Sequence, residues 1–204
     1  MTYPTRAPWA TGTMFTYATP PFTGSARKLV LHTMEVAEPA WPRYNNGGGL
    51  PHMSWNPGGR AYRQHIPFDR SARTLRSPGV PRSPNINAGV TIQVEIAGFA
   101  AAVSDYPDSW YDEVALRVGW LCDNLGIPRS FPLRFTDSPN ESVQVDWATW
   151  AATSGVVGHQ HAPYNDHWDP GDIATRLAPR LADAPVPPKP GAPAFPYPPG
   201  QCLF

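Results

Sequence analysis

The sequence predicts a mixed α/β domain in which a central β-sheet is flanked by helices. The first observation is that β-prone runs and helical patterns alternate along the chain, as they do in folds that pack helices on a sheet. The second is size, because 204 residues, 41% of them hydrophobic, are enough for one core. The third is that we find no internal repeat, which would predict a solenoid or a propeller instead.

Three segments have the pattern of β-strands. Residues 28–33 (KLVLHT) form a short β-prone run with a histidine near its end. Two β-prone arms within 52–66 flank the turn sequence Asn-Pro-Gly-Gly at 56–59, a strong signal for a hairpin. Residues 90–96 (VTIQVEI) alternate apolar and polar side chains, which is the period of a strand. These segments are expected to build the sheet.

One segment has the pattern of a long helix. Its apolar residues recur every three or four positions, at Trp110, Val114, Val118, Leu121 and Leu125. Asp108 or Ser109 is expected to cap its start with a side-chain oxygen. Gly126 is expected to end the helix, and Pro128 prevents its continuation. The expected helix therefore covers residues 110–125.

Two shorter helices are expected later in the chain. One covers about 143–153 and ends near Gly155. The other follows Pro170 and Gly171, and Pro179 should limit or kink it because proline lacks the backbone N–H that a helix interior needs.

The chain is expected to divide into three parts. Residues 1–27 are rich in Pro, Thr and aromatics without periodicity and suggest an extended N-terminal arm. Residues 28–184 are expected to form the α/β domain. Residues 185–204, beginning PVPPKPGAPAF, have the composition of a semi-rigid linker or tail, which normally leads to another module. A missing binding module is one interpretation of this tail.

Composition excludes several classes of function. The 16 Lys and Arg balance 16 Asp and Glu, so no basic field favours nucleic acid or an anionic membrane. No apolar run is long enough for membrane insertion, and residues 1–10 lack the pattern of a secretory signal, which predicts synthesis in a cytoplasm. Cys122 lies in the expected helix and Cys202 in the tail, so neither a disulfide nor a cysteine metal cluster is expected.

Candidate metal ligands concentrate in residues 158–171, GHQHAPYNDHWDPG. Imidazole nitrogens and carboxylate oxygens are zinc ligands, and a catalytic zinc site uses three of them and keeps one position open. Two prolines make this segment a loop that can fold its side chains around an ion. A distant third ligand would strengthen this interpretation, and His32 at the end of a strand is the candidate. Solvated loop histidines, and a structural role for His32, are the alternatives.

Four motifs in order resemble the zinc amidase family that includes bacterial anhydromuropeptide amidases, phage endolysins and peptidoglycan-recognition proteins. The first is the strand VLHT at 30–33, and the second is the hairpin from 52 followed by QHIPFD at 64–69. The third is TIQVEIAG at 91–98, and the fourth is Gly-His at 158–159 with Asp-Pro-Gly at 169–171. The resemblance covers about residues 28–178 and implies the amidase and peptidoglycan-recognition-protein-like fold.

The resemblance also implies the members of the site. It implies zinc (Zn²⁺) as the cofactor, with His32, His159 and Asp169 as metal ligands and His161 as the alternative to His159. Glu95 matches the catalytic base of the anhydromuropeptide amidases. The alternative for Glu95 is a solvent-facing residue on an alternating strand. His167 stands where many relatives carry lysine, and it either donates to an oxyanion, is a partner of the ligands or is an ordinary loop residue.

The function implied is hydrolysis of the amide between N-acetylmuramic acid and L-alanine in peptidoglycan. The partner is then a muropeptide, and the setting is that of a phage endolysin, a monomer made in the host cytoplasm that acts on the cell wall after release. Two other functions stay open: a non-catalytic peptidoglycan-binding module, and a zinc endopeptidase that cuts within the stem peptide.

The sequence also departs from the family pattern. Pro51 stands where some phage relatives have a catalytic tyrosine, and Arg73-Thr74 where relatives often have Trp-His. His52 matches a hairpin histidine that either lines the cleft or packs beneath it. Trp41 and the loop at 45–49 are expected to border the substrate groove.

Overall fold

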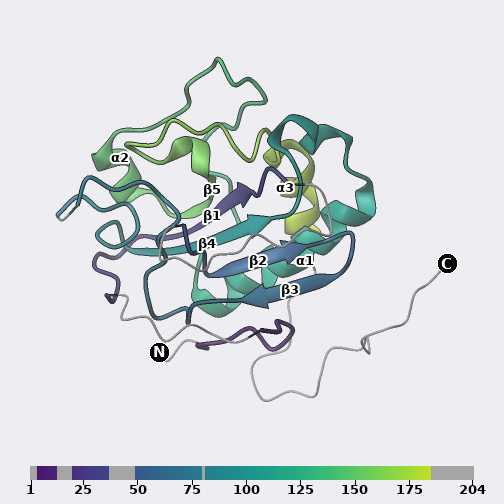
Figure 1. Cartoon of the computed structure of the whole chain (residues 1–204), viewed down its shortest axis with the longest axis horizontal. Helices are drawn as coiled ribbons and strands as arrows, with labels where there is room; N and C mark the ends of the chain where they lie inside the picture. Colours follow the sequence, from purple (N-terminus) through teal and green to yellow (C-terminus); the bar gives the residue numbers. More distant parts are fainter. Residues whose placement is uncertain (1–3, 13–19, 37–48, 80, 185–204) are drawn as a thin grey trace.

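A five-stranded sheet forms the centre of the protein in this computed structural model, which describes residues 4–12, 20–36, 49–79 and 81–184. The strands lie in the order β3-β2-β4-β1-β5 (Figure 1). Their bounds are β1 Arg27–Thr33, β2 Met53–Asn56, β3 Ala61–Gln64, β4 Val90–Ile96 and β5 Gly155–Gly158. β2 and β3 form the antiparallel hairpin, whereas the other neighbours are parallel. The prediction of a mixed α/β fold is confirmed.

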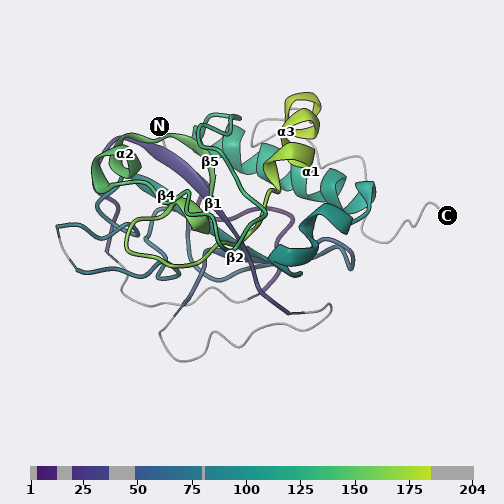
Figure 2. The ribbon, with the colours of Figure 1, turned by 90° about the horizontal axis from the view of Figure 1, so that it is seen from above.

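Both faces of this sheet are covered by other parts of the chain. Alternate residues of β1 and β4, including Leu31 and Val94, pack into the large core with α1 (Asp108–Leu125) and α3 (Ala174–Asp183). Residues on the other face, such as Val30, pack in a smaller core with Trp150 of α2 (Trp147–Ala152). Figure 2 shows α3 beside α1 and α2 apart from both. The polar residues of β1 and β4 therefore lie under loops and not in open solvent.

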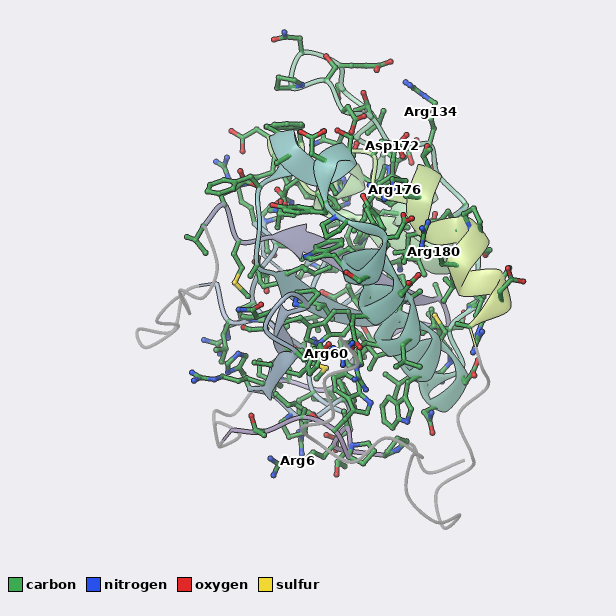
Figure 3. All side chains as sticks on the ribbon, turned by 90° about the vertical axis from the view of Figure 1, so that its right-hand side faces the viewer. Arg6, Arg60, Arg134, Asp172, Arg176 and Arg180 are labelled. Atoms are coloured by element: carbon green, nitrogen blue, oxygen red, sulfur yellow. The ribbon has the colours of Figure 1, made fainter. Side chains whose placement is uncertain are left out.

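The predictions of the first two helices hold with two changes, one at the start of α1 and one in the length of α2. α1 ends at Gly126, whose φ of 66° is left-handed, as expected. The predicted cap was wrong, because Pro107 precedes the helix and no side chain caps it. The Asp108 carboxylate instead pairs with Arg176 and Arg180 of α3, two residues labelled in Figure 3. α2 is shorter than expected, because the side chain of Asp146 accepts a hydrogen bond from Thr149 N and starts the helix there.

Four further elements differ from the expectation or were not part of it. α3 continues past Pro179 to Asp183, so this proline does not end the helix. β5 was not predicted, because its sequence, GVVG, is only four residues long. Two 3-10 helices, Ala100–Asp105 and His159–His161, were not predicted either.

The described N-terminal residues pack on the hairpin. The Trp9 ring meets Trp55, Tyr62 and Trp120 edge-on, at centroid distances of 6.0, 5.4 and 5.7 Å. Thr11 exchanges backbone hydrogen bonds with Tyr62 and Gln64, next to β3. Cys122 is a buried free thiol, whereas Cys202 and the tail at 185–204 lie outside the described residues. No helix in the described part of the chain is long and apolar enough to cross a membrane.

Candidate metal centre

The ends of three parallel strands bring the candidate ligands together. His32 is near the end of β1 and is the register partner of Glu95 on β4. β5 pairs with β1 up to Gly158, so His159 emerges beside His32. Asp169 arrives from the following loop. One ligand atom from each of His32, His159 and Asp169 lies within 4.8 Å of the others, and all three residues are buried.

His32 is the most unusual of these side chains, because both of its ring nitrogens are buried without a hydrogen-bond partner in the described residues. Its Nδ1 lies 3.7 Å from Asp169 Oδ2 and 3.9 Å from Glu95 Oε1. Burial, followed by the charge of His159, lowers the pKa of His32 to about 3, so the ring is neutral. A buried, neutral imidazole that faces carboxylates fits a metal ligand.

His159 has a defined tautomer. Its Nε2 lies 3.0 Å from Asn165 Oδ1, which can only accept, so Nε2 donates the hydrogen. The lone pair of Nδ1 then faces Asp169 Oδ1 at 3.1 Å. Two acceptors at this distance repel each other unless a proton or a cation lies with them. The donor set of two imidazoles and one carboxylate is one that zinc uses, and these residues therefore fit the metal.

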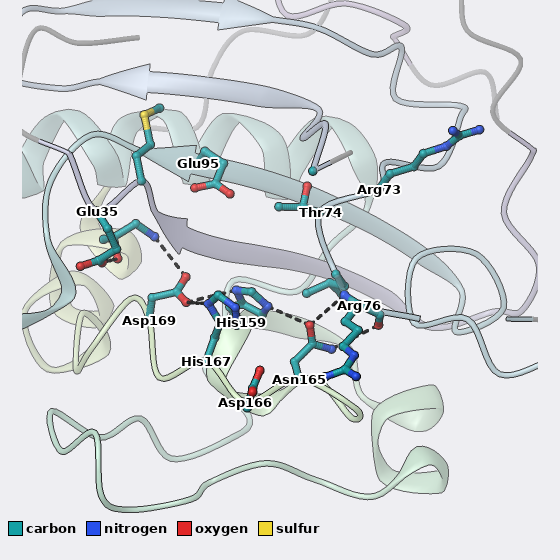
Figure 4. Close-up of a pocket in the computed structure, with 14 residues that line it drawn as sticks. Glu35, Arg73, Thr74, Arg76, Glu95, His159, Asn165, Asp166, His167 and Asp169 are labelled. Carbon is teal, nitrogen blue, oxygen red and sulfur yellow. Dashed lines mark hydrogen bonds and ion pairs between the residues drawn. The ribbon is translucent and has the colours of Figure 1, made fainter. Parts of the chain in front are cut away.

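Asp169 lies beside His159 and His167 (Figure 4), and its surroundings keep its carboxyl group ionised. Burial alone would raise its pKa, but the close contacts of Asp169 Oδ1 with the His159 and His167 rings, at 3.1 and 3.3 Å, outweigh burial and hold the pKa of this carboxyl well below its usual range. Thr33 N also donates to Asp169 Oδ2 at 3.3 Å. A carboxylate that stays ionised at this depth is a suitable ligand for a divalent cation.

Glu95 lies in a pocket of about 610 Å³ that also contains His159 and Asp169. The residue is only 9% exposed, so it does not face open solvent. Burial, and then the charges of Asp169 and Glu35, raise the pKa of Glu95 well above its usual value. A raised pKa in a pocket next to candidate ligands is the property expected of a general base.

One side of the His167 ring is exposed, and the other side packs on the candidate ligands His159 and Asp169. Its Nδ1 lies 3.3 Å from Asp169 Oδ1, and its ring stacks on His159 with centroids 4.3 Å apart. The hydrogen bond with Asp169 raises the pKa of His167, against the effect of partial burial. The protonated ring is thereby favoured at the mouth of the pocket.

His161 has no free ring nitrogen. Gly158 N donates to His161 Nδ1 at 2.9 Å, and His161 Nε2 donates to Arg134 O at 2.9 Å. The residue is fully buried, and burial lowers its pKa to about 4. This arrangement is that of a structural histidine that holds the turn after β5, and it leaves no lone pair for a metal.

His52 is a structural histidine by the same criterion. Its Nδ1 accepts from Gln93 N and its Nε2 donates to Arg70 O. Arg73 and Thr74 line the pocket, whereas Trp41 and residues 45–48 of the expected groove lie outside the described residues.

Sequence reasoning missed two residues of the pocket. Glu35 follows β1 in a left-handed conformation with φ of 52°, and its Oε1 accepts from Thr33 Oγ1 and Ala100 N. Asn165 hydrogen-bonds His159 and also the backbone of Arg76. Asn165 lies inside the His- and Asp-rich loop, so its place there was the available signal. Nothing in the sequence pattern indicated Glu35.

The comparisons with known proteins give only distant similarity. No family model and no curated protein sequence matches the chain. It is similar to a solved structure described as a crystal structure of a Se-Met AmpD derivative, with a TM-score of 0.49 and 15% identity over 89% of this chain and 99% of that chain. A mutant structure of PlyL gives a TM-score of 0.43 and 13% identity, over 80% and 88%. Similarity at this level carries no information about the reaction.

Proposed function

We propose that this protein is a zinc-dependent N-acetylmuramoyl-L-alanine amidase, which hydrolyses the amide between the lactyl group of N-acetylmuramic acid and L-alanine. The observation that carries the proposal is the buried group of His32, His159 and Asp169 beside the pocket carboxylate of Glu95. The order of the four sequence motifs supports the choice of peptidoglycan as substrate.

His32 and His159 would hold zinc through Nδ1, and Asp169 through its carboxylate. When bound there, zinc supplies Lewis-acid chemistry, which polarises a carbonyl and makes water acidic enough to lose a proton near neutral pH. The two unpartnered nitrogens of His32 and the facing acceptors of His159 and Asp169 support this assignment.

The chain's own residues move the protons. Glu95 takes a proton from the attacking water as the water oxygen bonds to the carbonyl carbon. The same carboxyl gives that proton to the amide nitrogen as the C–N bond breaks, which leaves a lactyl carboxylic acid and a free L-alanine amine. The second proton of the water stays on the new acid and then passes to the amine, so the final products are a carboxylate and an ammonium group. His167 donates a hydrogen bond to the carbonyl oxygen while this oxygen carries negative charge. Its raised pKa favours the donating, protonated form.

The role of His167 predicts a pH effect. Activity should fall as pH rises through the raised pKa of His167, because the neutral ring loses a donor. His167→Lys should move this alkaline limb to higher pH, since a lysine amine titrates at about 10.4. His167→Ala should lower kcat by about 10²–10³. The profile of kcat/KM against pH checks both, and an unchanged alkaline limb in His167→Lys would contradict the role.

Digestion of purified peptidoglycan, with and without added zinc, tests the proposed function. An amidase releases stem peptides that begin with a free L-alanine, and mass spectrometry identifies them. Fragments cut within the stem would assign the protein as an endopeptidase. Binding without any release would assign it as a binding module. Full lysis in excess chelator would contradict the role of the metal.

The setting we propose is that of a phage endolysin that acts as a monomer on the bacterial cell wall. The support is the resemblance of the motif order to a family that includes such enzymes. Lysis of intact cells by protein added from outside, together with a monomeric mass in solution, is the expected result.

A further inference from the structure

Two consecutive residues on the rim of the pocket are each held by one asparagine side chain. Leu75 N donates to Asn85 Oδ1 at 3.1 Å, and Asn85 Nδ2 donates back to Leu75 O at 2.7 Å. Arg76 N donates to Asn165 Oδ1 at 2.8 Å, and Asn165 Nδ2 donates back to Arg76 O at 3.3 Å. Both asparagines are buried, so these paired bonds fix the rim backbone.

The Asn165 side chain also contacts His159. Its Nδ2 also donates to Pro163 O at 2.8 Å, so the amide nitrogen faces two carbonyl oxygens and the amide cannot be turned around. Asn165 Oδ1 must therefore be the atom that faces His159 Nε2, at 3.0 Å. The hydrogen sits on Nε2 and the lone pair on Nδ1. Figure 4 shows Asn165 between Arg76 and His159.

The Asn85 side chain also contacts Gln93, a neighbour of His32 on the sheet. Gln93 Nε2 donates to Asn85 Oδ1 at 2.8 Å, which orients the Gln93 amide. Gln93 Oε1 and His32 Nε2 are both buried, and neither has a hydrogen-bond partner among the described residues. Gln93 and Glu95 lie on one face of β4, and His32 on β1 is the register partner of Glu95, so Gln93 and His32 lie on the same face of the sheet. His32 Nδ1 meanwhile faces Asp169.

We propose that Asn165 and Gln93 are positioning residues that fix His159 and His32, respectively, in the tautomer with hydrogen on Nε2. Asn165 and Asn85 connect these tautomers to the backbone of the pocket rim at Leu75–Arg76. Asn165 Oδ1 accepts from His159 Nε2, and the proposal pairs the unpartnered Gln93 Oε1 with the unpartnered His32 Nε2. This leaves Nδ1 of both rings as a lone pair directed at Asp169. Such outer partners orient the ligands of metal sites and raise their basicity. The inference rests on the proposed metal site, but the tautomers exist without metal and can be measured separately.

The test uses matched substitutions at the two amides. Asn165→Leu and Gln93→Met keep approximate size and remove the acceptor, whereas Asn165→Asp keeps an acceptor for His159. Gln144→Ala is the control, because the Gln144 side chain donates to the backbone oxygen of Asn165 and does not touch a histidine. Long-range ¹H–¹⁵N spectra of the metal-free protein report which ring nitrogen carries hydrogen. Competition with a chelator reports zinc affinity.

In the full chain, we expect the Nε2–H tautomer at both histidines, and Gln144→Ala should preserve it. Asn165→Leu and Gln93→Met should each give mixed tautomers at their own histidine and lower zinc affinity about 10–100-fold. Asn165→Asp should keep the Nε2–H tautomer of His159 and the zinc affinity of the unmodified protein. Unchanged tautomers and zinc affinity in Asn165→Leu and Gln93→Met would overturn the proposal. The same loss of tautomer and affinity in the control Gln144→Ala would also overturn it. If the wild-type protein shows the expected tautomers but binds no zinc, the proposed function fails while the positioning stands.

Discussion

Glu95→Gln is expected to lower kcat by about 10²–10⁴ while the protein retains its zinc. Glutamine has the shape of glutamate but cannot take a proton, so the substitution removes the base without opening a cavity. The Glu95 carboxylate also lies 3.9 Å from His32 Nδ1, beside the ligands and not among them. Turnover of purified peptidoglycan and metal content by elemental analysis, measured on the same sample, check the two parts of this expectation.

Glu35→Gln is the matched control, because Glu35 is a second carboxylate in the same pocket. Its Oε1 accepts hydrogen bonds, and the glutamine oxygen can keep them. The variant should retain most of its turnover. Because the charge of Glu35 contributes to the raised pKa of Glu95, its removal lowers that pKa and should move the acid limb of activity to lower pH. Full activity in Glu95→Gln, or loss in Glu35→Gln alone, would reassign the base.

The sequence predicted those elements of the fold whose side chains repeat at a regular period. β1, β4 and α1 have such patterns, and the hairpin has a specific turn sequence. The elements that were missed have no period to detect: β5 has four residues, and the turn at His159–His161 has three. The cap of α1 was predicted wrongly because Asp108 pairs with α3, a contact between segments far apart in the chain.

The candidate site could be predicted in part for a similar reason. His159 and Asp169 lie in one short loop, so their types and spacing were visible together. The orientation of Glu95 was not decidable from alternation, because both faces of this sheet are covered and a polar residue on β4 need not face solvent. Asn165 and Gln93 are ordinary amides in sequence. Asn165 reaches His159 through a hydrogen bond made in the folded chain, and Gln93 comes to share a sheet face with His32 only when β1 and β4 pair.

His159→Ala is expected to abolish stoichiometric zinc binding, whereas His161→Asn is expected to retain one zinc. The reason is that His161 uses both ring nitrogens in hydrogen bonds, and His159 directs a free Nδ1 lone pair toward Asp169. Asn can mimic the acceptor Nδ1 of His161 but leaves Arg134 O without its donor, so the free energy of unfolding should fall by about 1–3 kcal/mol. Denaturant unfolding and metal content of both variants separate the two effects. Retained zinc in His159→Ala, with loss in His161→Asn, would make His161 the ligand and give His159 the structural role.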